Sequence, residues 1–273
     1  GPLWHDHLTT IGNEFCSHVS SLTTLNLSGM GSLTNIGQGF CQYAKALTSL
    51  DLSGMASLTS IGSGFCRGAS SLTSLDLSGM TSLTTIGDWF CLNAKSLTSL
   101  DLSGIAGLTS IGDWFCLNAK SLTTLNLSGM ISLATIGCRF CRDASSLTSV
   151  NLSRTISLIS LEYGFCDGAS AFTNLDVRGS RVDIAKLNLS GIRSLKKLVL
   201  QSWQTKYVEE GPAHYEVVVE GLPWSWGYHA HCSRSVQVGV LCLFQGVTFV
   251  DHNGGTRFIP SEIALEICKY IDA

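Results

Sequence analysis

The sequence has no long apolar run and no strong excess of either charge. Its apolar stretches are far shorter than the ~20 residues that a membrane-spanning helix needs, so no membrane span is expected. The net charge of −3 gives no general attraction to nucleic acid or anionic lipid, and neither is expected as a partner. No signal peptide is expected either, and residues Gly1 to Trp4, without an initiator Met, are interpreted as a tag-protease scar.

Recognisable metal and catalytic motifs are missing as well. His229, His231 and Cys232 lie close together in the sequence, but the ligand spacing of zinc sites is not met. No known signature surrounds a Cys–His pair that could act as nucleophile and base. The other candidates in this region are His214, Cys242, Asp251 and His252. We therefore expect no metal, no cofactor and no catalytic residue, and we predict that the protein is not an enzyme.

Cysteine, by contrast, is abundant and regularly placed. The chain has 11 cysteines, an odd number that leaves one thiol unpaired in any full set of disulfides. Seven of them are spaced by 25 residues: Cys16, Cys41, Cys66, Cys91, Cys116, Cys141 and Cys166. Equivalent residues of stacked units form a column, so these thiols are predicted to be small apolar core residues. Together with the Asn-Leu-Ser sequons on the predicted strand surface, they favour a reducing compartment, the cytoplasm.

The whole region up to about residue 180 repeats with this period of 25. In the unit from Leu72 to Ser96, the motif Leu-x-x-Leu-x-Leu alternates Leu75 and Leu77 with Asp76 and serine, which predicts a strand with its leucines inward. A Ser-Gly pair then turns the chain. A fixed period of this length is typical of a solenoid, in which each unit buries its apolar side against the next one.

The return segment of each unit is predicted to hold a short helix. Asp88 is a good N-cap two residues after Ile86, and Phe90 and Ala94 then fall on one helical face. The predicted fold class is α/β. It is a solenoid with a parallel sheet on its concave face and short helices on its convex face.

This pattern resembles the leucine-rich repeat family, over roughly residues 8–200. It is most similar to the cysteine-containing and BspA-like members, a style abundant in protists and kinetoplastids. BspA-like units often place Ala-Phe-x-x-Cys after Ile-Gly, whereas this chain has Phe90, Cys91 and Ala94 in the same three places. The usual asparagine after the strand is replaced by an apolar column, Met80 in this unit. The resemblance implies a surface that binds other proteins, usually through the exposed strand positions.

Two regions are predicted. Residues 3–200 form the solenoid, with seven regular units and atypical final ones, and residues 201–273 form a small α+β module or cap. In the second region, residues 215–220, 236–244 and 247–250 are predicted strands and residues 260–271 a helix. The first unit has no polar cap, which suggests an array cut from a longer one.

The exposed strand positions give one set of candidate contact residues. Asp51, Asp76 and Asp101 follow one another at the same place in three units, where they could form a mildly acidic binding strip. The alternative is a polar ladder whose members satisfy one another. A hydroxyl ladder of the ice-binding kind fits poorly, because Asp or Asn fills the central column.

The return segments give a second candidate set. Trp89 and Leu92 recur as Trp114 and Leu117 in the next unit. Both leucines are predicted to face solvent, and both tryptophans to flank the buried face. Exposed apolar patches and tryptophans are typical of contact sites. Alternatively, the tryptophans cover the groove between units, or the pair reflects a recent duplication.

These patterns predict a non-enzymatic, intracellular scaffold that binds an unidentified protein. The alternative is a substrate adaptor of a ubiquitin ligase, because residues 258–271, with Pro260 and Glu262, are similar to the opening of an F-box. An ordinary amphipathic helix with proline near its first turn explains the same residues.

Overall fold

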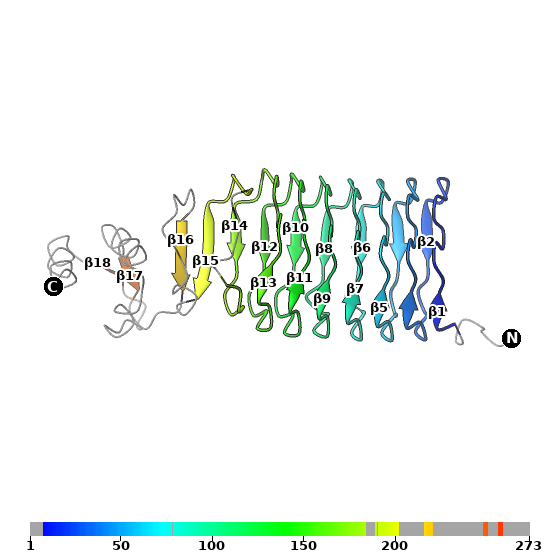
Figure 1. Ribbon diagram of the computed structural model, residues 1–273, viewed down its shortest axis with the longest axis horizontal. Coiled ribbons are helices and arrows are strands. Elements are labelled where there is room, and N and C mark those ends of the chain that lie inside the picture. Colours follow the sequence, from blue (N-terminus) through cyan, green and yellow to red (C-terminus); the bar gives the residue numbers. More distant parts are fainter. Residues whose placement is uncertain are drawn as a thin grey trace.

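The repeats form a stack of coils in which each coil adds one strand to each of two parallel sheets (Figure 1). The structure is a computed structural model. It describes residues 8–77, 79–183, 189, 191–201, 216–220, 248–250 and 256–258. The predicted solenoid with a parallel sheet is confirmed for this part of the chain, whereas the second sheet was not predicted.

The first sheet contains the longer strands and runs the length of the stack. Its nine strands are β2 (Thr24–Asn26), β4 (Ser49–Asp51), β6 (Ser74–Asp76), β8 (Ser99–Asp101), β10 (Thr124–Asn126), β12 (Ser149–Asn151), β14 (Asn174–Asp176), β15 (Lys197–Gln201) and β16 (Glu216–Glu220). The second sheet contains seven strands of two residues each. They are β1 (Thr10–Ile11), β3 (Asn35–Ile36), β5 (Ser60–Ile61), β7 (Thr85–Ile86), β9 (Ser110–Ile111), β11 (Thr135–Ile136) and β13 (Ser160–Leu161).

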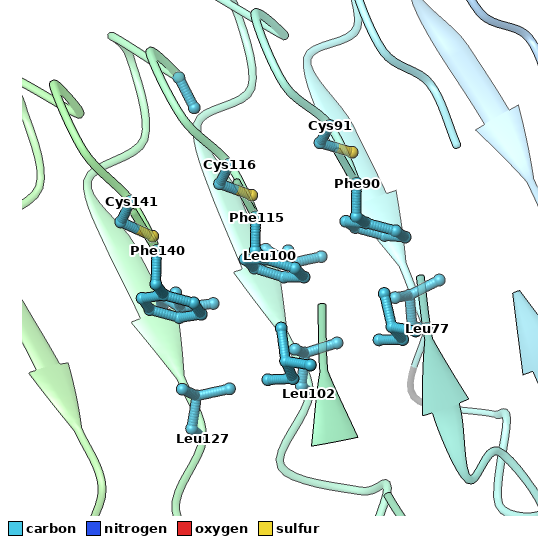
Figure 2. Packing of buried hydrophobic residues seen from close by; sticks show 14 of the residues in the cluster. Leu77, Phe90, Cys91, Leu100, Leu102, Phe115, Cys116, Leu127, Phe140 and Cys141 are labelled. Carbon is cyan, nitrogen blue, oxygen red and sulfur yellow. The ribbon is translucent and has the colours of Figure 1, made fainter. Parts of the chain in front are cut away.

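The strands pair without any shift in register, so each residue lies beside its equivalent in the next coil. Leu75, for example, pairs with Leu100, and Ile86 pairs with Ile111. Equivalent side chains therefore stack in columns that run along the core. Figure 2 shows one phenylalanine and one cysteine from each of three neighbouring coils. The rings of Phe90 and Phe115 stack with centroids 5.0 Å apart and planes 5° from parallel.

Threonines that precede the strands tie neighbouring coils together. The amide and the hydroxyl of Thr84 both donate to the carbonyl oxygen of Thr59, at 2.9 and 3.0 Å. On the other side of the coil, Thr98 donates to the Thr73 carbonyl in the same way, with both distances 3.1 Å. Because the donor and acceptor are 25 residues apart, this ladder fixes the register between coils.

The short helix predicted for the return segment is wrong. Residues 88–93 form successive turns, and every second residue has positive φ: Trp89 (60°), Cys91 (51°) and Asn93 (60°). Their amides bond to other coils, because Trp89 donates to the Asp113 oxygen at 2.8 Å and Cys91 to the Phe65 oxygen at 2.8 Å. A helix is about 10 Å wide, about twice the spacing of paired strands, so a helix on every coil would force the coils apart on this side.

A column of glycines allows the coils to approach on the same side. A Cβ on Gly87 would lie 2.6 Å from the Ser63 nitrogen and 2.8 Å from the Gly62 carbonyl carbon. Glu162 occupies this column in the last regular coil. Its amide lies 3.4 Å from the Ile136 oxygen, whereas the amide of Gly87 lies 2.9 Å from the Ile61 oxygen. A side chain at this position thus loosens the contact between coils.

The region predicted as a carboxy-terminal module is described only in short strands. Strand β16 pairs in parallel with β15, so the strand predicted at residues 215–220 extends the sheet of the repeats. Strands β17 (Thr248–Val250) and β18 (Thr256–Phe258) pair antiparallel, and β17 matches the strand predicted at 247–250. The predicted strand 236–244 and helix 260–271 lie outside the described residues, and the division at residue 200 stays a prediction. No helix in the described part of the chain is long and apolar enough to cross a membrane.

We expect Gly87→Ala to lower the free energy of unfolding by about 1–3 kcal/mol, because the added methyl group would overlap the backbone of the preceding coil. The midpoint of urea denaturation, followed by circular dichroism, measures the loss. Gly12→Ala is the matched control, since Gly12 begins the same column and a Cβ there meets no atom within 4 Å. Equal losses in the two variants would contradict the role of close approach.

Candidate functional site

The acidic residues of the long-strand sheet brace the turns that follow their own strands. The Asp51 carboxylate accepts a hydrogen bond from the amide of Ser53 at 2.9 Å, and Asp101 accepts one from Ser103 at 2.9 Å. The bond from the Ser53 amide is the main reason that the pKa of Asp51 lies below its usual value, although Asp76 opposes the shift. These contacts favour the predicted polar ladder. Contact of Asp51, Asp76 and Asp101 with a partner stays a prediction.

The second candidate set lies on the turn face, the surface formed by residues 87–96 and by their equivalents in every coil. Trp89 is 40% exposed and Trp114 is half-buried. The prediction that both leucines face solvent is wrong for Leu92, which is only 7% exposed, and Leu117 is half-buried. The physical reason is the alternating turn conformation, because a helix would have pointed Leu92 away from the core.

Two arginines that the sequence did not single out pack against these tryptophans. The guanidinium of Arg67 lies between two rings, 5.5 Å from the centroid of Tyr43 and 5.1 Å from that of Trp89. The guanidinium of Arg139 lies 4.3 Å from the Trp114 ring. These distances are within the range of cation–π attraction.

These contacts join side chains of six successive coils in two groups, the first ending at Trp89 and the second beginning at Trp114. We call the two groups together the aromatic–arginine strip: His18, Tyr43, Arg67, Trp89, Trp114 and Arg139. At its amino end the His18 and Tyr43 rings are 4.9 Å apart. The tryptophans predicted as contact residues are therefore the middle of a larger surface.

Two glycines flank Arg67 in its coil, and one of them makes room for Tyr43. A Cβ on Gly68 would lie 2.5 Å from Cδ1 of Tyr43, so a side chain there would displace the ring. Gly64 has φ of +76° and holds the place that Trp89 takes one coil later. In the coil of Arg67, the two positions equivalent to Trp89 and Asn93 of the next coil therefore carry no side chain. The sequence contained this signal, since Gly-Phe-Cys-Arg-Gly at 64–68 departs from the Trp-Phe-Cys-Leu-Asn of the next two units.

Neither Arg67 nor Arg139 forms an ion pair with a described residue. The ion pairs of this part of the chain include Arg142 with Asp143 at 3.6 Å and Arg178 with Asp176 at 2.6 Å. The Nε atoms of Arg67 and Arg139 are buried and have no hydrogen-bond partner among the described residues. The strip thus holds two guanidinium groups that lie over aromatic rings and pair with no carboxylate of the described residues.

A second exposed apolar group lies toward the carboxy end. Its members, all at least half exposed, are Ile131, Ile156, Ile159 and Tyr163. Earlier coils hold small or polar residues in these columns, such as Thr81 and Thr84. The signal in the sequence was this change from small or polar to apolar residues within the columns, and it was not singled out.

The cysteine column belongs to the core, as predicted. Cys41, Cys66, Cys91, Cys116, Cys141 and Cys166 are buried, and Cys16 and Cys138 are half-buried. Burial raises the pKa of every one of the six buried thiols, that of Cys41 to about 12. Such neutral, sealed thiols are poor nucleophiles and poor metal ligands.

No cluster of three or more metal-binding side chains occurs among the described residues. The histidines and cysteines considered as metal or catalytic candidates, from His214 to His252, lie outside that part of the chain.

The repeat pattern matches a known family model, the BspA type leucine rich repeat region. Six copies match, within residues 4–122 and 34–166, which together span more than half of the chain. The chain belongs to the BspA-type leucine-rich repeat family. No curated protein matches it in sequence.

Several solved structures are similar to this BspA-type chain. A leucine rich cell surface protein from Faecalibacterium prausnitzii is 14% identical, covers 83% of this chain and 86% of its own, and has a TM-score of 0.35. A leucine-rich repeat protein from Bacteroides ovatus is 12% identical, with coverages of 77% and 88% and a TM-score of 0.24. The functional domain of InlJ from Listeria monocytogenes, which includes a cysteine ladder, is 16% identical, with coverages of 78% and 68% and a TM-score of 0.17. These proteins are bacterial, and a protist source stays a prediction.

The raised thiol pKa values predict a loss of stability in alkali. An unfolded thiol ionises near pH 8.5 to 9, whereas the buried thiols stay neutral to higher pH, so the unfolded state loses its protons first. The stabilising effect is therefore complete below about pH 8 and declines as the pH rises toward 12. Urea denaturation at a series of pH values from 7 to 10 measures this decline.

The double variant Cys91→Ala/Cys116→Ala serves as the control for other titrating groups. Its stability should be lower at neutral pH, because two buried sulfur atoms are lost, yet it should fall less steeply above pH 8.5. A slope equal to that of the unaltered protein would show that the column does not cause the effect.

Proposed function

We propose that this chain is a non-enzymatic scaffold that binds another protein, and that the aromatic–arginine strip is its contact surface. The observation that carries the proposal is the contrast between the long-strand face and the turn face of the stack. The long-strand face uses its aspartates on its own turns. The turn face presents a 40%-exposed tryptophan and two arginines that form no ion pair with a described residue. Tryptophan and arginine are the residue types most enriched where binding energy concentrates.

Membership of the family supports the general role, since repeat stacks of this kind are surfaces for binding. The ubiquitin-ligase alternative gains nothing from the match, which ends at residue 166, well before the F-box-like segment. We therefore keep the simpler binding role.

A reducing compartment is part of the same proposal. The six buried thiols do not distinguish a reducing from an oxidising compartment, because buried, neutral thiols resist oxidation in either one. The half-buried Cys16 and Cys138 are the described thiols that an oxidising medium would attack. The support for the cytoplasm is the odd number of 11 cysteines, which leaves one thiol unpaired in any full set of disulfides.

Replacement of both Trp89 and Trp114 by alanine is expected to weaken capture of the protein partner by roughly 30-fold or more, as loss of a central aromatic contact does. The partner is isolated from the source cell with the unaltered chain, and its dissociation constant is then measured for each variant. The fold should persist, because the strip lies outside the phenylalanine and leucine core.

Tyr163→Ala is the matched control, since Tyr163 is an exposed aromatic residue outside the strip. If this variant lost the partner while the tryptophan variant kept it, the carboxy-terminal apolar group would be the contact surface and the strip would not.

A further inference from the structure

The arrangement of charges on the strip indicates the chemistry of what it binds. Each guanidinium lies over one or two rings, 4.3 to 5.5 Å from their centroids, within the range of cation–π attraction. Arg142 on the same face already has Asp143 at 3.6 Å, whereas Arg67 and Arg139 have no carboxylate partner among the described residues. A planar guanidinium with unoccupied N–H groups is suited to bind a carboxylate through two hydrogen bonds.

The spacing of the two arginines sets the spacing of the carboxylates. Arg67 lies one coil before Trp89, and Arg139 lies one coil after Trp114. The two residues are three coils apart, but the Arg139 guanidinium lies over the ring of Trp114 in the preceding coil. The two guanidinium groups are therefore separated by between two and three coils, which is roughly 10–14 Å at about 4.8 Å per coil. An extended peptide advances about 3.3 Å per residue and presents alternate side chains on one face. Both acidic side chains must point to the same face, so they must be an even number of residues apart. A separation of four residues spans about 13 Å and matches the distance between the guanidinium groups.

The tryptophans lie between the two charges. In an extended peptide whose acidic residues are four apart, the residue midway between them points to the same side. This residue would pack over Trp89 and Trp114, where an apolar side chain would bury surface that is otherwise exposed.

We infer that the strip binds an extended acidic segment of the partner protein, with the pattern acidic–x–apolar–x–acidic, lying along the axis of the stack. The inference rests on the proposed function and specifies the partner's chemistry. One carboxylate meets Arg67, the other meets Arg139, and the apolar residue covers the tryptophan pair. The matched charges also make association faster at low salt and weaker as salt is added.

A labelled peptide containing Glu-Ser-Leu-Ser-Glu tests the inference directly, by fluorescence anisotropy with the full chain. Two control peptides have the same length: one with Gln in place of both Glu residues, and one with the order Glu-Ser-Leu-Glu-Ser. We expect each control to bind at least tenfold more weakly, because one or both charge-assisted hydrogen bonds are lost. Equal binding of either control would overturn the inference. Tighter binding of a single-stranded oligonucleotide than of the peptide would also overturn it.

Variants of the chain supply the second arm. Arg67→Gln and Arg139→Gln should each weaken binding of the acidic peptide about tenfold or more, whereas Arg142→Gln should leave it within twofold, since Arg142 already has an acidic neighbour. Thermal unfolding of each variant checks the fold. An equal loss in Arg142→Gln would mean that general charge, and not the strip, attracts the peptide.

The same variants separate this inference from the proposed function. If Trp89→Ala/Trp114→Ala lost the captured partner while Arg67→Gln/Arg139→Gln kept it, the strip would still be the contact surface. The acidic character of the partner segment would then be wrong.

Discussion

Hydrogen bonds between coils, made without any shift in register, are the interaction on which the rest of this structure depends. Each threonine before a strand donates twice to the carbonyl of its equivalent one coil earlier, and the strands continue that pairing. Because the coils are only one strand spacing apart, every residue type must suit its own copy as a neighbour. Phenylalanines can stack, thiols can pack, and the glycines of the Gly87 column are needed where backbones nearly touch.

The same constraint shapes the turn face. The narrow spacing excludes a helix on each coil, so the backbone alternates positive and negative φ and sends its amides to the coils on either side. Positive φ in a residue other than glycine is unfavourable. Here it recurs at every cysteine of the column, from Cys16 to Cys166, and the bonds between coils offset its cost.

Function in such a protein depends on the residues that depart from the repeat. A column of identical side chains stabilises the stack, but it gives a partner no feature that distinguishes one coil from the next. Arg67, Arg139 and the tryptophan pair depart from the columns around them, and across coils Arg67 contacts Trp89 while Arg139 contacts Trp114. Gly64 and Gly68 are part of the same departure, because Gly68 leaves space for Tyr43 and Gly64 holds the place that Trp89 takes in the next coil.

The sequence by itself determined the period, one of the two parallel sheets and the core, since an exact repeat leaves only in-register stacking as a way to bury its leucines. It also singled out Trp89 and Trp114. It could not determine the conformation of the return segment, because the N-cap residue and apolar spacing there fit a helix as well as a series of turns. Only the contact between coils decided this, and with it the burial of Leu92 and the position of Arg67 between two rings. Those contacts join residues from different coils, so no single unit of the sequence contains them.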